Sequence, residues 1–302
     1  MQLNAFIAEV ESKGIAFTLN EPMHQHTTFR IGGNADVFIK VVKTDELCAV
    51  LCAAQKYCVP TFLLGRGSNL LVSDDGIEGA VVSLGGMNDI KVLGDEIVCG
   101  AGASLSAVCV AARDNSLTGL EFAFGIPGSI GGALFMNAGA YGGEMSQVIK
   151  SAECVDSDGN ITTLTAEQMS LGYRTSIFKR GGLYITEVTL ELKKGDRQAI
   201  STQMEELTAR RKEKQPLEFP SAGSTFKRPE GYFAGALIEK NGLKGLSVGA
   251  AQVSEKHAGF VINKGGASCK DVCALIEKIQ QRVLEADGVL LETEVLKTGR
   301  NI

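Results

Sequence analysis

The amino-acid sequence predicts an α+β protein made of two or three packed domains. Its 302 residues are more than one hydrophobic core usually holds, and an apolar content of 44% is enough to fill several. Short runs of β-favouring residues alternate with helical patterns, and glycine turns separate them. After Pro216 and Pro220 the composition changes to glycine loops between two helices, which indicates a separate C-terminal segment.

The first part of the chain predicts a small unit of helices and strands at residues 1–88. An amphipathic pattern in MQLNAFIAEVESKG predicts the first helix, and β-favouring runs follow in TTFRIGG and ADVFIKVV. A helix is expected from Thr44, which precedes two acidic residues, to about Tyr57. The segments PTFLLGRGSN and GAVVSL then predict strand, glycine loop and strand.

A second unit is predicted at residues 89–196. It begins near Ile90 with the strand DEIVCGAGA and continues through a helix at 105–113. Two strands in SAECVDSDGNITTLT turn at Asp158-Gly159, a pair typical of hairpins, and LYITEVTLEL predicts a further strand.

The remaining residues, 197–302, predict a connector helix and a small α+β domain. A polar helix is expected at 197–214, and two more helices at 233–241 and 269–286. The run VLLETEVLKTG predicts a final strand.

Charge and hydropathy exclude several classes of partner. The formal net charge is −5, and the basic residues are spread along the chain rather than gathered in a stripe that would attract a phosphate backbone or an anionic membrane. The N-terminus has no basic leader, and no apolar run approaches the roughly 18 residues of a membrane span. We therefore expect a cytoplasmic monomer that binds neither nucleic acid nor membrane.

The eight cysteines do not form a disulfide pattern typical of an exported protein. Residues such as Cys48, Cys52, Cys109 and Cys154 sit in apolar patterns and are interpreted as small buried hydrophobic residues. Cys269 and Cys273 share one helix face at i and i+4, but with three histidines in the whole chain no metal site is expected. No cysteine lies in an evident electropositive motif, so a cysteine nucleophile is not expected either.

Two glycine-rich loops predict contacts with phosphate. Glycine accounts for 36 residues, above the usual fraction of about 7%. In LGRGSN, Gly65 and Gly67 can adopt positive φ and present backbone N–H groups to an anion, although a tight turn satisfied by its own asparagine explains this loop equally well. In GIPGSIGGALF, a short helix begins among glycines, and its first N–H groups could also face phosphate. Neither loop has the G-x-G-x-x-G pattern of a Rossmann domain, so an FAD fold of another type is the better candidate.

Six motifs in order give the sequence a resemblance to the UDP-N-acetylenolpyruvoylglucosamine reductase (UDP-N-acetylmuramate dehydrogenase) family. They are TTFRIGGNAD, LGRGSNLLVSDDG, EFAFGIPGSIGGALFMNAGAYGGE, YRTSIFK, AGSTFKRP and LETEV, and they span nearly the whole chain. The resemblance implies a two-subdomain FAD-binding fold of the vanillyl-alcohol-oxidase (PCMH) type, a C-terminal α+β substrate domain, noncovalent FAD and NADPH as hydride donor. It assigns FAD contacts to Arg30, Gly32, Gly33, Gly65, Arg66, Gly67, Ser68, Asn69, Ile126, Pro127, Gly128, Ser129, Gly132 and Ala133.

The resemblance also implies three catalytic residues for reduction of the enolpyruvyl ether of a UDP-sugar. Arg174 matches an arginine whose paired donors suit a carboxylate and the anion that forms beside it. Ser224 matches the proton donor, and Glu294 matches a glutamate that assists the enol intermediate. Period-two alternation puts Glu292 on the same face as Glu294, so spacing leaves both open and only the motif register selects Glu294. Taken alone, a surface ion pair, a loop or cap serine and a solvated edge carboxylate would be the more common interpretations of the three.

Substrate contacts are assigned by the same resemblance to Tyr173, Lys227, Arg228, Lys244 and Gln252. The segment after Tyr173 is short, which indicates the form of the family without the covering tyrosine loop, and that tyrosine is assigned to no residue here. Arg228 stands where longer-form relatives have an asparagine. His257, a lone histidine in a glycine-rich turn, is interpreted as structural.

Two alternatives remain open from the sequence. An FAD-dependent oxidase of the same superfold would commonly attach its flavin through histidine or cysteine, for which His24 and His26 make a poor site. A nonenzymatic flavin-binding protein would bind flavin without turnover. Neither alternative gives Arg174, Ser224 and Glu294 a role.

Overall fold

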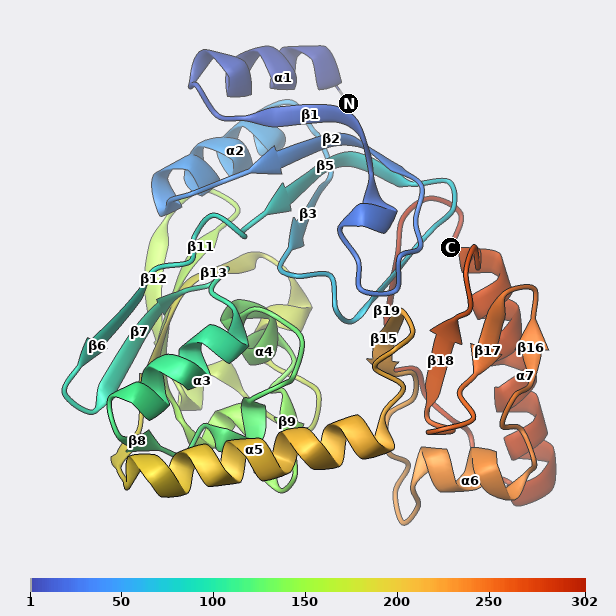
Figure 1. Cartoon of the computed structure of the whole chain (residues 1–302). Helices are drawn as coiled ribbons and strands as arrows, with labels where there is room; N and C mark the ends of the chain where they lie inside the picture. Colours follow the sequence, from blue (N-terminus) through green and yellow to red (C-terminus); the bar gives the residue numbers. More distant parts are fainter. Residues whose placement is uncertain (1) are drawn as a thin grey trace. The chain divides into compact units, whose positions relative to one another are not determined.

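The computed structural model describes residues 2–302 and divides into two compact units (Figure 1). Unit 1 contains the described residues up to Leu19, with Val37–Arg66 and Gly79–Arg210. Unit 2 contains Asn20–Asp36, Gly67–Glu78 and Arg211–Ile302. This grouping interleaves along the chain, in contrast to the continuous ranges 1–88, 89–196 and 197–302 expected from the sequence, and those domain boundaries stay a prediction.

The first sheet has four strands in the order β1-β2-β5-β3. Its strands are β1 (Phe17–Pro22), β2 (Asn34–Lys40), β5 (Ile77–Ser83) and β3 (Thr61–Leu64), and its helices are α1 (Leu3–Ser12) and α2 (Thr44–Lys56). Strands β3 and β5 pair in parallel, and the central residues 80–82 of β5 are fully buried. A continuous apolar run is what a strand covered on both faces requires.

The second sheet of unit 1 has five strands in the order β12-β11-β13-β7-β6. Its strands are β6 (Ile90–Leu93), β7 (Glu96–Gly100), β11 (Ile149–Asp156), β12 (Ile161–Thr165) and β13 (Leu183–Glu191). The predicted hairpin between β11 and β12 is confirmed: Gly159 has φ +84° in the turn, and the Asp156 carboxylate accepts the N–H groups of Asp158 and Asn160. Helices α3 (Leu105–Asp114) and α4 (Ile130–Phe135) pack against this sheet.

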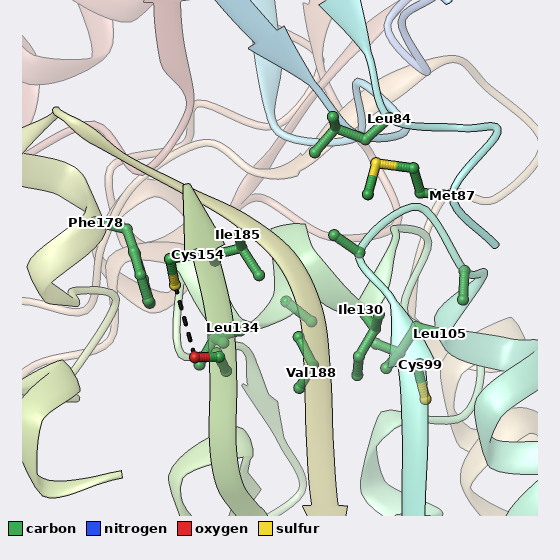
Figure 2. Packing of buried hydrophobic residues seen from close by; sticks show 14 of the residues in the cluster. Leu84, Met87, Cys99, Leu105, Ile130, Leu134, Cys154, Phe178, Ile185 and Val188 are labelled. Carbon is green, nitrogen blue, oxygen red and sulfur yellow. Dashed lines mark hydrogen bonds between the residues drawn. The ribbon is translucent and has the colours of Figure 1, made fainter. Parts of the chain in front are cut away.

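One continuous hydrophobic core runs through unit 1. Leu105 of α3 and Ile130 and Leu134 of α4 pack with Cys99 of β7 and Val188 of β13 (Figure 2). The same core includes residues of β2, β5 and α2. Both predicted FAD-binding subdomains therefore contribute to one core.

Unit 2 is built on a second, smaller core around the sheet β15-β18-β17-β16. Its elements are β15 (Ser221–Ser224), α6 (Ala234–Lys240), β16 (Ser247–Val248), β17 (Ala251–Val253), β18 (Phe260–Asn263) and α7 (Cys269–Asp287), with a parallel pair of β4 (Leu70–Val72) and β19 (Leu296–Thr298). Helix α7 begins with a capping box between Ser268 and Asp271 and ends at Gly288, whose φ is +68°. Its apolar residues recur at helical spacing and face the core, which explains its position against β16 and β17.

The remaining elements are short strands and 3-10 helices, together with the long helix α5. They are η1 (Met23–Gln25), β8 (Leu117–Thr118), η2 (Glu121–Ala123), β9 (Gly139–Ala140), β10 (Gly143–Glu144), η3 (Met145–Gln147), η4 (Glu167–Met169), η5 (Ile177–Arg180), β14 (Lys193–Lys194) and α5 (Arg197–Lys214). Helix α5 has the predicted bounds. Among the described residues, no helix combines the length and the apolar character that a membrane crossing requires.

One expected strand is wrong, and another is confirmed only in part. The TTFRIGG segment is irregular because Arg30 has φ +55° and Gly32 has φ +136°, neither of which fits a strand. The run VLLETEVLKTG forms a strand only at β19, preceded by a single bridge between Thr293 and Phe226. Alternation still holds there, because Leu291 and Val295 are buried and Glu292 is exposed.

The cysteines are all free thiols, but their burial differs from the expectation. Cys109 and Cys154 are buried in the core of unit 1 as predicted. Cys52 is exposed and Cys48 is half-buried, so the interpretation of these two as buried hydrophobic residues is wrong. Both lie on α2, where the helical pattern did not distinguish the core face from its border.

Candidate functional site

Arg174 lies at the tip of a tight turn in unit 1. Gly172 and Thr175 exchange both backbone hydrogen bonds, at 3.1 and 3.2 Å, so that Tyr173 and Arg174 form the tip. Arg174 has φ +52°, a conformation that costs free energy in a residue with a Cβ. Its guanidinium lies 5.1 Å from the centre of the Tyr173 ring and donates to the carbonyl of Gly139 at 3.2 Å. The arginine is therefore presented on a constrained turn rather than on a flexible loop.

Hydrogen bonds attach this turn to the segment 135–139. Ser176 donates to the carbonyl of Phe135 at 2.7 Å, and the Asn137 amide donates to the carbonyl of Gly172 at 3.0 Å. The sequence analysis assigned no role to Asn137. A signal was present in the motif MNAGAYGG, because asparagine is the residue that most readily combines a left-handed backbone with side-chain hydrogen bonds.

The first residues of one predicted phosphate loop and the start of the other meet in unit 1, at Gly65 and Ser129. A Cβ added to Gly65 would lie 2.6 Å from the Ser129 hydroxyl oxygen, so the end of β3 and the start of α4 touch at this point. Arg66 and Pro127 on either side are exposed, and Ser129 is buried. Glycine at 65 is thus required by close packing, and the two loops form one surface region.

The amide groups at the start of α4 are used within the protein. The N–H groups of Ile130 and Gly131 donate to the carbonyls of Ala103 and Ala101, both at 2.9 Å, and that of Gly132 donates to the Ser129 hydroxyl at 3.3 Å. The expectation that these particular N–H groups face a phosphate is not met. The contacts of Gly128, Ser129, Gly132 and Ala133 with a cofactor stay a prediction.

Three further predicted glycines lie in unit 2 and closely approach other segments of the chain. A Cβ on Gly33 would lie 2.2 Å from the carbonyl oxygen of Asp74, and one on Gly67 would lie 2.1 Å from that of His26. Gly32 would meet the side chain of Val72 at 2.7 Å. The glycine clusters in TTFRIGG and LGRGSN are therefore explained by close contact between chain segments, and a role in binding FAD for Arg30, Gly32, Gly33 and Ser68 stays a prediction.

Ser224 and Glu294 lie on neighbouring segments of unit 2. The Glu294 N–H donates to the carbonyl of Thr225 at 2.8 Å, next to Ser224, which is exposed at the end of β15. Asn69 adds a third segment, because its side-chain amide donates to the carbonyl of Glu294 at 3.1 Å. Unit 2 thus brings together the predicted proton donor and the predicted glutamate, while Arg174 belongs to unit 1.

The predicted substrate-binding side chains of unit 2 have partners of their own. Lys227 pairs with Glu292 at 2.9 Å, and this hydrogen bond lowers the pKa of the exposed Glu292 carboxyl. Lys244 pairs with Glu239 at 2.6 Å. The Arg228 guanidinium stacks over the Phe233 ring at 3.9 Å, and Gln252 donates to the carbonyl of Gly245 at 3.2 Å.

His257 has a structural environment, as expected. Its Nδ1 accepts the N–H of Gly259 at 3.1 Å, and its ring contacts Phe260 edge-on. Burial lowers the pKa of His257, which favours the neutral ring that this hydrogen bond requires.

The cysteine pair of α7 differs from the sequence interpretation. Cys273 is half-buried, and a hydrogen bond with Cys269, together with the positive charge of Lys297, lowers the pKa of its thiol. The sequence analysis found no electropositive motif around a cysteine, and it could not identify Lys297 as a neighbour of Cys273 because the two are distant in sequence. Within residues 2–302, no cluster of three or more histidine, cysteine or acidic side chains is arranged to hold a metal ion.

Comparison with known proteins identifies two matching family models and several close relatives. An FAD binding domain model matches residues 35–165, and a model for the UDP-N-acetylenolpyruvoylglucosamine reductase C-terminal domain matches residues 215–297. The chain is 52% identical to the UDP-N-acetylenolpyruvoylglucosamine reductase of Clostridium perfringens strain SM101, covering 94% of this chain and 93% of the relative. It is 50% identical to that of Clostridium botulinum strain Hall, covering 93% and 92%.

A solved structure is also similar over almost the full length. The UDP-N-acetylenolpyruvylglucosamine reductase of Thermus caldophilus is 36% identical and superposes with a TM-score of 0.80, covering 94% of this chain and 98% of the other. The predicted α+β class, with an FAD-binding domain followed by the family's C-terminal domain, is confirmed by these matches.

Proposed function

Because the chain belongs to the UDP-N-acetylenolpyruvoylglucosamine reductase family, we propose that it reduces UDP-N-acetylglucosamine enolpyruvate to UDP-N-acetylmuramate, a step of peptidoglycan precursor synthesis. FAD is the bound cofactor and NADPH the source of hydride. The observation that carries the proposal is the 52% identity, over 94% of the chain, with a relative of that name. In the overall reaction NADPH loses a hydride, the terminal vinyl carbon gains it, and the neighbouring carbon gains a proton.

The two glycine loops fit a dinucleotide cofactor. FAD, when bound, supplies two-electron transfer between the nicotinamide and the vinyl group. The FAD-domain match covers both glycine loops, which touch at Gly65 and Ser129, and the exposed Arg66 side chain is suited to a pyrophosphate. We assign Arg66, Ile126, Pro127, Gly128 and Ser129 to this site.

Arg174 is proposed to bind the substrate carboxylate and to stabilise the anion that forms when hydride arrives. A guanidinium presents paired donors to a carboxylate, and a fixed positive charge in a site closed to water stabilises developing negative charge without reorganisation. The constrained turn around Arg174 supports this role. Tyr173, which packs under the guanidinium, is proposed to contact the substrate as well.

Ser224 is proposed to donate the proton to the neighbouring carbon. A hydroxyl is a weak acid, so this role depends on the strongly basic enolate and on a nearby charge that stabilises the alkoxide. Glu294 is proposed to assist at the same place, which the Thr225 to Glu294 hydrogen bond supports. Lys227, Arg228, Lys244 and Gln252 are proposed to contact the UDP part of the substrate.

Isotope labelling tests the proposed reaction directly. The protein is supplied with FAD, the enolpyruvyl sugar and NADPH in deuterium oxide, and the product is examined by NMR and mass spectrometry. We expect one solvent deuteron on the carbon next to the carboxylate. NADPH carrying deuterium at its transferable position should label the methyl carbon, allowing for any exchange at the flavin.

The control replaces the substrate with UDP-N-acetylglucosamine, which lacks the vinyl group and should leave NADPH consumption at its background rate. Oxygen-dependent turnover of a hydroxy compound would instead favour an oxidase, and flavin binding without any product would favour a nonenzymatic protein. The monomeric state and the cytoplasmic location stay predictions, and sedimentation velocity tests the first.

A further inference from the structure

We propose that Asn137 is a positioning residue that fixes the Arg174 turn onto the C-terminal end of α4. The inference rests on the proposed function, because it gives Asn137 a role through Arg174. Helix α4 begins beside the glycine loop at Ser129 and ends beside Asn137. The same short helix would then fix both the cofactor loop and the carboxylate-binding arginine.

Asn137 is completely buried, and both ends of its amide are used. Its Nδ2 donates to the carbonyl of Gly172 at 3.0 Å, and its Oδ1 accepts the N–H of Ser146 at 2.8 Å. The backbone at Asn137 has φ +41°, in the left-handed region. Asparagine is among the few residues that tolerate this conformation, and an amide supplies a donor and an acceptor together. A buried side chain that joins three separate segments is expected to limit their relative movement.

The turn is attached to the segment 135–139 at three points. Asn137 bonds to its first residue, Gly172, and the Arg174 side chain bonds to the carbonyl of Gly139. Ser176, just after the turn, donates to the carbonyl of Phe135. All three contacts lie within unit 1. The left-handed backbone conformation of Arg174 is unfavourable by itself and persists only because surrounding contacts hold it. One of these contacts is the hydrogen bond from Asn137 to Gly172 at the base of the turn.

Fixing the turn has a specific consequence for the reaction. Arginine has a long and flexible side chain. The extent to which it stabilises the transition state therefore depends on how precisely its backbone is positioned. Loss of the Gly172 bond should let the turn move while the FAD loops at the other end of α4 stay in place. The step that uses Arg174, reoxidation of the flavin by the enolpyruvyl sugar, should therefore slow selectively.

Asn137→Gly is the first test, because glycine accepts φ +41° and removes both side-chain bonds. In FAD-loaded protein we expect the rate of flavin reduction by NADPH to stay at the wild-type level. The rate of reoxidation at saturating sugar should fall by about tenfold or more, the size of effect expected from slight misplacement of a catalytic group. A purely structural role would lower FAD content or thermal stability and leave the ratio of the two rates unchanged, which would overturn the proposal.

Ser176→Ala tests the same attachment without altering a residue in the left-handed conformation. It is the deciding variant if Asn137→Gly does not fold or does not retain FAD. We expect a smaller selective loss of reoxidation. Thr186→Val is the control, because Thr186 is also a buried hydroxyl of unit 1 that bonds a backbone carbonyl, that of Glu153 at 3.1 Å, and in addition the Glu153 carboxylate at 2.9 Å. Equal rate ratios in Ser176→Ala and Thr186→Val would overturn the proposal. A wild-type protein inactive in both half-reactions would instead contradict the proposed function.

Discussion

Two glutamates of the LETEV segment have different surroundings. Glu292 is exposed and pairs with Lys227, which holds the pKa of its carboxyl below its usual value. Glu294 is half-buried, and its backbone is bonded to Thr225 beside Ser224. A carboxyl that takes part in proton transfer is better placed near the donor in a partly dry setting than in an exposed ion pair. We therefore propose Glu294 over Glu292 on grounds that do not depend on motif register.

The two glutamates provide a matched pair of variants. Glu294→Gln should lower the rate of flavin reoxidation by the sugar by about 100-fold or more, the usual range for a lost proton-transfer group. Glu292→Gln should leave that rate nearly unchanged at saturating sugar and affect mainly KM through Lys227. Steady-state kinetics in the two variants measures both effects. The reverse ranking would show that the register assignment of Glu294 is wrong.

Cys273 is expected to react as a thiolate at lower pH than an ordinary thiol. A hydrogen bond with Cys269 and the charge of Lys297 lower the pKa of Cys273, while the hydrogen bond with Cys273 and burial raise the pKa of Cys269. The rate of alkylation by iodoacetamide at Cys273, followed by mass spectrometry of its peptide, should reach half its maximum below the pH of a free thiol. Lys297→Gln should move this midpoint upward, and an unchanged midpoint would contradict the contribution of Lys297.

The lowered pKa of Cys273 also determines how this thiol makes the free energy of unfolding depend on pH. The folded chain lowers the pKa of Cys273, so the folded state favours the thiolate more than the unfolded state does. The stabilisation from Cys273 is complete above the pKa of the unfolded thiol and is lost as the pH falls through the folded value, whereas the raised pKa of Cys269 has the opposite sign and destabilises the folded state as the pH rises above the pKa of the unfolded thiol.

At the scale of elements, helix α7 depends on a carboxylate from a distant segment. The Asp74 side chain accepts the N–H groups of Cys269 and Lys270 at 2.8 and 3.1 Å, in addition to the capping box at Ser268. A negative charge at a helix N-terminus satisfies free N–H groups and interacts favourably with the helix dipole. The cap also ties the segment 67–78 to the C-terminal part of unit 2.

Removing this cap should loosen α7. Asp74→Ala should lower the opening free energy of the first turn of α7 by about 1 kcal/mol, as for other lost caps. Hydrogen exchange of the α7 peptide measures it. Asp75→Ala, at the exposed neighbouring carboxylate that contacts Asn301, is the control and should leave α7 exchange unchanged. Equal exchange in both variants would mean that the Ser268 box alone holds the helix start.

The helices could be predicted from the sequence better than the strands. Helix α5 has the expected bounds, and α6 and α7 differ from them by about one residue, because apolar periodicity and caps are local signals. The TTFRIGG segment was predicted wrongly because its conformation is set by contact with β4 and the residue after it: Gly32 lies against Val72, and Gly33 donates to the carbonyl of Ser73. A local pattern carries no information about such a partner.

The candidate site could be predicted from the sequence only in part. The motif residues Ser224 and Glu294 lie on neighbouring segments of unit 2, and their proposed common role stays a prediction. The supporting contacts were not accessible, since Asn137 and the Arg174 turn are far apart in the chain and meet only in the fold. The electropositive setting of Cys273 also depends on a residue of β19 that no spacing rule connects to α7.

At the scale of the whole molecule, two compact units carry different parts of one proposed reaction. Unit 1 contains Gly65, Ser129 and Arg174, and unit 2 contains Ser224, Glu294 and the predicted UDP contacts Lys227, Arg228, Lys244 and Gln252. Unit 2 also includes Asn20–Asp36 and Gly67–Glu78, so the chain passes between the units several times.

The central claim is that this chain transfers hydride from NADPH through FAD to an enolpyruvyl sugar. The most direct measurement is an anaerobic visible spectrum of the purified protein with FAD, followed by addition of NADPH and then of UDP-N-acetylglucosamine enolpyruvate. The account predicts flavin absorption that bleaches with NADPH and returns in proportion to the sugar added. A protein that takes up no FAD, or whose bleached flavin is not restored by the sugar, would contradict it.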